Sequence, residues 1–325
     1  AGNFNNEYGL PLTLLALEET HELAVLELGM SHAGEIRLLA DICRPDTGLI
    51  TNIAPVHLEF FPGLREIAEA KAELLEKLSA EGHFFFNRDD AELRRVARLF
   101  PGGKTGFGFG QDCDVRITEL QILHLRKMRL SIRGRLGEYR TILPFIGRPA
   151  AYNLAAALAI AEFYEVQPDM IHRRIPDLRP PAMRGEILSI GRITLWNDTY
   201  NANPLAVEAL LETLGSITGY PRKVVVLGDM LELGRDSEKF HRRAGRQAAS
   251  CGPDLLITVG RQAAVIGEAA EESGFPSNRI FHLAGAEEAA IFLAERLEPG
   301  DLVAIKGSRG LKMETVVQQL REATV

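Results

Sequence analysis

The chain has 325 residues, which is enough for about two domains of roughly 150 residues each. Its 46% apolar and 25% charged residues are ordinary for a globular protein. Its formal net charge of −7 argues against nucleic acid as a partner, because phosphate binding needs a basic surface. No apolar run approaches the roughly 20 residues of a membrane span, and the three cysteines show no metal-type spacing. We therefore expect a cytoplasmic protein with reduced thiols and no membrane insertion.

Strands and helices alternate along the first half of the chain. Short, near-continuous apolar runs at residues 23–28 and 48–53 predict parallel strands buried on both faces. From about residue 115 to 145, apolar and charged residues alternate, which predicts antiparallel strands with one exposed face. Helical periodicity predicts helices at residues 64–78, 89–99 and 152–164, and after Pro168.

The run Arg179-Pro180-Pro181 predicts a hinge between two domains, 1–179 and 180–325, because two prolines stiffen a link and interrupt helices. Beyond it, strands and helices alternate again, which predicts an α/β fold with a Rossmann-like second domain. The strands are predicted at residues 186–190, 193–196, 224–227, 255–259 and 302–305.

Polar residues follow three of these strands at their carboxyl ends, where open α/β sheets bind ligands. The strand at 193–196 leads into residues 197–204, where Asn203 suits a helix N-cap and Pro204 the first helical position. Residues 228–230 and the cationic turn 306–310 follow two other strands. Each alone is compatible with plain turn chemistry, but three at one edge favour a ligand crevice.

Lys71 lies on the apolar face of the predicted helix 64–78, in the stripe Leu64, Ile67, Lys71, Leu74 and Leu78. One reading is that its stem covers apolar surface while the amine stays in water. The other is a partly dry site, where a lowered pKa makes the amine reactive.

Glu27 near the end of one predicted strand and His57 after the next predict a pair of ligands for a divalent cation. A histidine such as His57, taken alone, is more often a structural loop residue than a ligand. Together with Lys71, the two residues favour a site at this edge of the sheet.

Gly103-Lys104-Thr105 looks like the end of a phosphate-binding P-loop. That motif requires another glycine five residues before its Gly-Lys pair, where this chain has Arg98. We reject this motif, and no other stretch of the chain supplies a P-loop.

The chain resembles the Mur ligase family over nearly its whole length, and within it the ligases that add D-alanyl-D-alanine. The most specific match is Tyr200-Asn201-Ala202-Asn203-Pro204. The other matching segments, in order, are residues 2–6, 9–13, 27–36, 51–59, 69–71, 228–234 and 306–309.

The resemblance implies a central ATP-binding domain, incomplete at its N-terminus, followed by a Rossmann-like ligase domain. It implies that ATP and Mg²⁺ are used to join D-alanyl-D-alanine to a UDP-N-acetylmuramoyl-tripeptide through an acyl phosphate. Such activation is chemically sensible, because a carboxylate is a poor electrophile and phosphate a good leaving group. A monomer is expected.

The resemblance also implies roles for individual residues. Glu27, His57 and a carbamylated Lys71 would organise the metal and the reaction. Asn153 would lie near the adenine, Arg184 near the phosphates and Asp198 at the ribose. The remaining matches would bind the muramoyl substrate or the acceptor, and they are Asn5, Asn6, Tyr200, Asn201, Asn203, Asp229, Glu232, Lys306, Ser308 and Arg309.

The chain departs from the family pattern in two ways. Residues 147–150 read Gly-Arg-Pro-Ala where the family usually has Gly-Arg-His-Asn. The chain also starts beyond the position of the family's P-loop and uridine-binding domain, so we expect this polypeptide alone to be inactive.

Two alternatives remain open. One is a ligase of the same superfamily with a different acceptor, such as an amino acid added to a muramoyl peptide or glutamate added to folate. The other is a non-catalytic nucleotide-binding scaffold.

Overall fold

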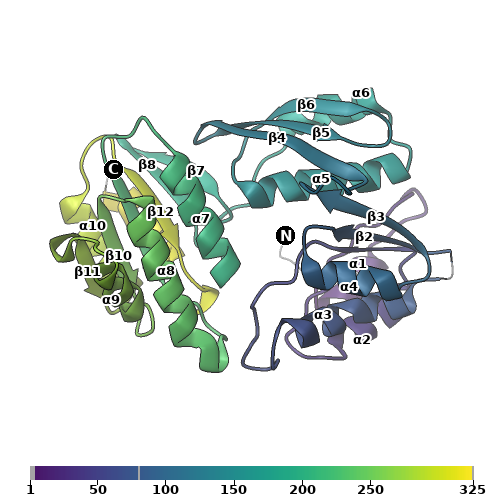
Figure 1. The fold of residues 1–325 in the computed structure, drawn as a ribbon, viewed down its shortest axis with the longest axis horizontal. Coiled ribbons are helices and arrows are strands. Elements are labelled where there is room, and N and C mark those ends of the chain that lie inside the picture. The colour runs from purple at the N-terminus through teal and green to yellow at the C-terminus, as the bar shows by residue number, and fades with distance from the viewer. Residues whose placement is uncertain (1–3, 80, 324–325) are drawn as a thin grey trace.

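The computed structural model describes residues 4–79 and 81–323, so Gly2 and Asn3 of the first matching segment lie outside it. The chain forms two six-stranded sheets, which lie in two lobes (Figure 1). Helices pack against both faces of each sheet, and the predicted α/β fold class is confirmed. Among the described residues no helix is long and apolar enough to cross a membrane.

The first sheet has the order β1-β2-β3-β4-β5-β6, with parallel pairing from β1 to β4 and antiparallel pairing from β4 to β6. The alternating pattern therefore correctly predicted the antiparallel part. The strands are β1 (Thr47–Ile50), β2 (His83–Asn87), β3 (Gly103–Gly108), β4 (Val115–His124), β5 (Lys127–Arg133) and β6 (Glu138–Leu143). The rejected P-loop candidate at residues 103–105 lies in β3, as a strand and not as a phosphate loop.

Helices cover the two faces of this sheet differently. Ile67 of α3 and Leu93 of α4 pack with Phe84 and Phe86 on one face, and α5 packs along the other. The helices are α1 (Gly9–Leu15), α2 (Glu35–Cys43), α3 (Leu64–Ala72), α4 (Ala91–Leu99), α5 (Arg148–Phe163) and α6 (Pro168–Arg174). The predicted helix 64–78 ends earlier as an α-helix and continues as the 3-10 helix η1 (Glu73–Lys77).

The predicted strand at residues 23–28 is wrong. The segment is not assigned to any strand, and the Val25 side chain is 96% exposed. An apolar run becomes a strand only where a neighbouring strand satisfies its backbone groups, and no described strand pairs with this segment.

The second sheet has the order β11-β10-β9-β12-β8-β7, parallel except for the antiparallel pair of β7 with β8. Its strands are β7 (Glu186–Ile190), β8 (Ile193–Asp198), β9 (Lys223–Gly228), β10 (Leu255–Val259), β11 (Ile280–Leu283) and β12 (Leu302–Lys306). Of the strands of this second sheet, only β11 was not predicted. Helices α7 (Pro204–Ser216), α8 (Ser237–Cys251) and α9 (Ala264–Glu272) share a core on one face, and α10 (Ala286–Arg296) and α11 (Glu314–Ala323) share one on the other.

Candidate active site

The carboxyl ends of β8 and β12 meet through a buried ion pair. Lys306, only 3% exposed, ends β12 opposite Asp198 of β8. Its amine donates to Asp198 Oδ2 at 2.6 Å and to the Asn201 carbonyl oxygen at 2.9 Å. The structure thus brings together three residues that the sequence placed at one sheet edge.

Ser308 ties the same edge to the loop after β9. Its hydroxyl donates to the Ala202 carbonyl and accepts from the Leu231 amide, while its own amide donates to the Asp229 carbonyl. Three segments far apart in the sequence are therefore fixed around one buried hydroxyl. Asn203 caps α7 by accepting from the Ala206 amide at 3.0 Å, so the cap predicted from the sequence is confirmed.

The carboxylate of Asp229 is directed into the protein. It is buried, and its Oδ1 accepts from the Ala263 amide at 2.6 Å. A Cβ at Gly260 would lie 2.7 Å from this carboxylate, so the close approach requires glycine. The buried carboxylate of Asp229 therefore fixes the position of the loop after β9 by bonding to the Ala263 amide inside the protein.

Sequence reasoning missed His241 as a support of the same loop. The buried His241 ring accepts from the Met230 amide at Nε2 and lies 2.7 Å from the Ser237 carbonyl at Nδ1. Burial lowers the pKa of this imidazole, which favours the neutral ring that such an arrangement needs. A single histidine in an amphipathic helix gave no signal of this role.

Two guanidinium groups flank Tyr200 at the same edge. The Arg184 guanidinium lies 3.9 Å from the centre of the ring and that of Arg309 lies 5.8 Å from it. The Tyr200 amide donates to the carbonyl of Met183, a non-glycine residue in the left-handed region at φ +61°. This cationic pair suits an anionic group such as a phosphate or carboxylate.

In the first lobe, Asn5 contacts Glu27. The Asn5 amide group donates to Glu27 Oε1 at 3.1 Å, and the Gly29 amide donates to the Asn5 carbonyl. A Cβ at Gly29 would lie 2.8 Å from the Asn5 side chain. Asn6 instead lies just before α1, where its side-chain oxygen accepts from the amide of Gly9, the first residue of the helix, at 2.8 Å.

The amine of Lys71 donates to the carbonyl oxygen of Asn52 at 3.1 Å, in the loop after β1. Burial lowers the pKa of this amine, and the nearby Asp90 carboxylate opposes that effect in part. Asp90, which the sequence analysis did not single out, caps α4 and also accepts from the Ile53 amide at 2.7 Å. It therefore holds the loop that carries both Asn52 and His57.

His57 reaches across to the second lobe. Its Nδ1 lies 2.5 Å from Oε2 of Glu232. The sequence assigned these residues to the metal and to the substrate, and the structure places them in contact. Asn153 lies exposed on α5, and among the described residues no hydrogen bond or ion pair joins it to the other predicted site residues.

The donor set of the first lobe suits a hard divalent cation. Glu27 offers a carboxylate and His57 an imidazole, and a carbamate on Lys71 would add oxygens, with phosphate and water completing the ligands. Among the residues that the structure describes, no three His, Cys, Asp or Glu side chains form a ready-made metal cluster. The described contacts join Glu27 to Asn5, His57 to Glu232 and Lys71 to Asn52, so only the chemistry of these donors, and no assembled cluster, supports a cation here.

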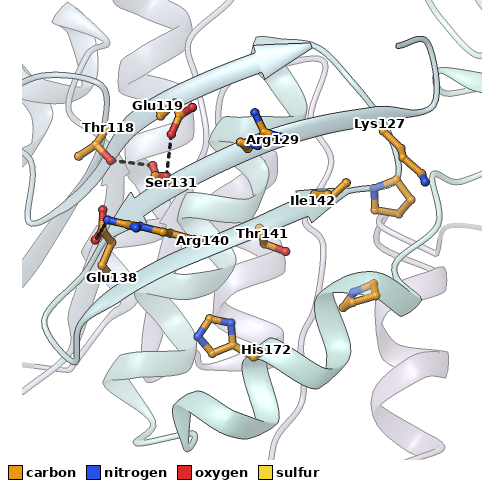
Figure 2. Close-up of a pocket in the computed structure, with 12 residues that line it drawn as sticks. Thr118, Glu119, Lys127, Arg129, Ser131, Glu138, Arg140, Thr141, Ile142 and His172 are labelled. Atoms are coloured by element: carbon orange, nitrogen blue, oxygen red, sulfur yellow. Dashed lines mark hydrogen bonds and ion pairs between the residues drawn. The ribbon is translucent and has the colours of Figure 1, made fainter. Parts of the chain in front are cut away.

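An open groove of about 1060 Å³ runs along the exposed face of β4, β5 and β6 beside α6 (Figure 2). Its polar side chains largely satisfy one another, since Ser131 donates to Glu119 and Arg140 donates to Glu138. None of the predicted site residues lines this groove. Its lining residues are Thr118, Glu119, Lys127, Arg129, Ser131, Glu138, Arg140, Thr141, Ile142, Pro144, His172 and Pro176.

Comparison with known proteins agrees with this arrangement. Residues 1–161 match the Mur ligase middle domain, and residues 183–309 match the Mur ligase glutamate ligase domain. The UDP-N-acetylmuramoyl-tripeptide–D-alanyl-D-alanine ligase of Bacillus subtilis is 33% identical over 99% of this chain and 69% of its own length.

Solved structures show the same similarity. A crystal structure of MurF from Acinetobacter baumannii has a TM-score of 0.88 and 30% identity, covering 99% of this chain and 70% of that one. MurF from Thermotoga maritima, in complex with ADP, has a TM-score of 0.87 and 26% identity, covering 100% and 73%.

The chain belongs to the Mur ligase family, whose members of this type are ATP-dependent peptide ligases. Within that family its relatives are the UDP-N-acetylmuramoyl-tripeptide–D-alanyl-D-alanine ligases. The resemblance drawn from the sequence is confirmed.

Proposed function

We propose that this chain joins D-alanyl-D-alanine to a UDP-N-acetylmuramoyl-tripeptide, driven by ATP, in the synthesis of the peptidoglycan precursor. The observation that carries the proposal is the 33% identity to a ligase of this specificity across 99% of the chain. The contacts that gather residues 198–203, 229–232 and 306–309 at one sheet edge support it, because the most specific matching residues lie there.

Residues 1–179 form the ATP-binding part in this proposal, and residues 180–325 form the acceptor part. Glu27 and His57 hold Mg²⁺, with Lys71 as a carbamate. When bound, the ion neutralises charge on the transferring phosphate. Asn153 and Asp198 face the adenosine, and Asn5 and Asn6 face the muramoyl substrate.

The second domain supplies positive charge to the reacting groups. Arg184 and Arg309 flank Tyr200 and bind phosphate or the carboxylate of the dipeptide. Lys306 and Ser308 hold the surrounding loops in place, so that these cations are ordered before substrate binds. Asn201, Asn203, Asp229 and Glu232 complete the acceptor side, chiefly by fixing backbone positions.

The proposal places the reaction in the cytoplasm, where ATP and nucleotide-linked precursors are available, and has the protein act as a monomer. Light scattering of the purified protein tests the oligomeric state. A stable dimer would contradict that part of the proposal.

The test of specificity is a competition between acceptors. The complete gene product is incubated with ATP, Mg²⁺ and UDP-N-acetylmuramoyl-tripeptide, together with D-alanyl-D-alanine, D-glutamate and L-alanine at equal concentration. We expect mass spectrometry to show the pentapeptide product alone. A product with another acceptor would support a different ligase, and no product from folded protein would support the scaffold.

A further inference from the structure

Three consecutive residues of the first lobe contact one loop region of the second. His57 contacts the Glu232 carboxylate, and the Glu59 amide donates to the Glu232 carbonyl at 3.1 Å. Between them, the Leu58 side chain packs against the apolar cores of both lobes. The two lobes are therefore joined here by side chain, backbone and apolar contacts together.

The backbone on both sides of this contact is unusual. His57 has a φ of +56° and Glu232 a φ of +61°, a region that non-glycine residues occupy at a cost. Gly234 nearby has a φ of +54°, and a Cβ there would lie 3.1 Å from the Leu58 carbonyl oxygen. Such conformations persist where the surroundings determine them, and they concentrate at functional sites.

The partners fix which ring nitrogen of His57 carries the proton. An ionised carboxylate can only accept, so Nδ1–H of His57 donates to Glu232 Oε2. In the neutral ring the Nε2 atom then holds a lone pair, and it has no partner among residues 4–79 and 81–323. Histidines that bind metals commonly donate their other N–H to a carboxylate, which fixes the tautomer and the ring orientation.

We propose that Glu232 is a positioning residue for His57, holding its ring across the lobe boundary so that Nε2 is presented to a divalent cation. The claim that Nε2 of His57 binds a cation rests on the proposed function. The contact between His57 and Glu232, and the tautomer that it fixes, do not depend on that function. Because Glu232 belongs to the second lobe, docking of the lobes and binding of the cation favour each other.

The first test reads the tautomer of His57 by ¹⁵N NMR of histidine-labelled chain, with the signal assigned by loss in His57→Asn. At a pH at which histidine is neutral, we expect the proton on Nδ1 in the wild type, and a shift of the proton toward Nε2 in Glu232→Ala. Glu232→Gln should keep the wild-type tautomer, because its amide oxygen still accepts.

Glu238→Ala is the matched control, since Glu238 is an exposed residue of α8 in the same lobe and no contact joins it to the first lobe. Glu238→Ala should leave the His57 signal unchanged. The circular dichroism spectrum of every variant should match that of the wild type. A proton on Nε2 of the neutral wild-type ring, or an unchanged signal in Glu232→Ala, would overturn the proposal.

The second test measures binding of Mn²⁺, as a spectroscopic substitute for Mg²⁺, to the complete gene product with ATP. We expect Glu232→Ala to weaken Mn²⁺ binding by about ten-fold, the low end for such supporting residues because the contact is partly exposed. If Glu232→Ala changes the His57 tautomer but leaves the Mn²⁺ affinity unchanged, the link to the cation is overturned, while the contact between Glu232 and His57 is still supported. Absence of Mn²⁺ binding in the wild type would instead count against the proposed function.

Discussion

Lys71 is the residue at which two readings of the sequence were open. Its amine donates to a backbone carbonyl and burial lowers its pKa, which favours the partly dry site over the solvated amine. Only the neutral amine reacts with CO₂, and a lowered pKa makes the amine neutral at a lower pH than a free lysine. The environment therefore favours carbamylation.

We predict that the chain in ¹³C-bicarbonate shows a carbamate carbon signal by NMR, and that Lys71→Ala removes it. The signal should persist on acidification past the pH at which a free lysine would lose it, because the lowered pKa keeps the amine neutral there. Lys77→Ala is the control, since that amine is paired with Asp41 at 2.7 Å. A signal that survives in Lys71→Ala would exclude Lys71 as the modified residue.

The ion pair of Asp198 with Lys306 carries a second prediction, on stability. Asp198→Asn leaves a buried ammonium group without its counter-charge. We expect a loss of about 2–3 kcal/mol in the free energy of unfolding, below the about 3–5 kcal/mol of a fully buried pair because the Asp198 side chain is 23% exposed.

Urea unfolding measures this loss. The exposed pair of Asp236 with Lys239, 3.8 Å apart, is the control, and Asp236→Asn should change stability by less than about 0.5 kcal/mol. Equal losses in the two variants would show that burial of Lys306 does not govern the effect.

Some residue roles could be predicted from the sequence and others could not. The Asn203 cap follows from local sequence, because the side chain of Asn203 needs only the unpaired backbone amide of Ala206, three residues later, as its partner. The inward direction of Asp229 depends on the segment between β10 and α9, and the support from His241 depends on α8 packing beside the loop, which no local pattern encodes. Likewise, the contact of His57 with Glu232 spans 175 residues of sequence.

Among the elements, most of the strongly patterned ones were predicted, but β2 was missed although its residues 84–86 are three consecutive buried phenylalanines. β12 and β9 are continuous apolar runs, and the alternation of β5 is clear. The short strand β11 has only four residues, too few to show a period. The segment 23–28 has the composition of a strand, but no described strand pairs with it. Composition alone does not show whether a neighbouring strand is present.

The packing of α8 against α9 carries a prediction at the scale of elements. A Cβ at Gly245 of α8 would lie 2.2 Å from the Ile266 carbonyl oxygen. Gly245→Ala should therefore destabilise the chain by about 1–3 kcal/mol through overpacking, which outweighs the gain of about 1 kcal/mol in helix propensity.

Gly215→Ala in α7 is the matched control for urea unfolding. Its added Cβ would lie 3.2 Å from the Cβ of Cys251 and 3.6 Å from the backbone of that residue, a much milder approach than at Gly245. We expect this variant to unfold within about 1 kcal/mol of the wild type. A stability of Gly245→Ala equal to that of the control would show that the two helices can separate at little cost.

At the scale of the whole molecule, two sheets of different topology lie in two lobes (Figure 1), and residues 57–59 and 232–234 join these lobes. The first lobe carries the residues proposed for the metal, and the second carries the cations proposed for the acceptor. Amide bond formation between two bound substrates requires both sets at once, because the gain from proximity depends on their joint geometry.

The measurement that tests this account most directly is phosphate release by the complete gene product, with ATP, Mg²⁺ and UDP-N-acetylmuramoyl-tripeptide, with and without D-alanyl-D-alanine. We predict sustained release only when the dipeptide is present, in equal amount to the pentapeptide formed. Release that is independent of the dipeptide, or no release from folded protein with all substrates, would contradict the account.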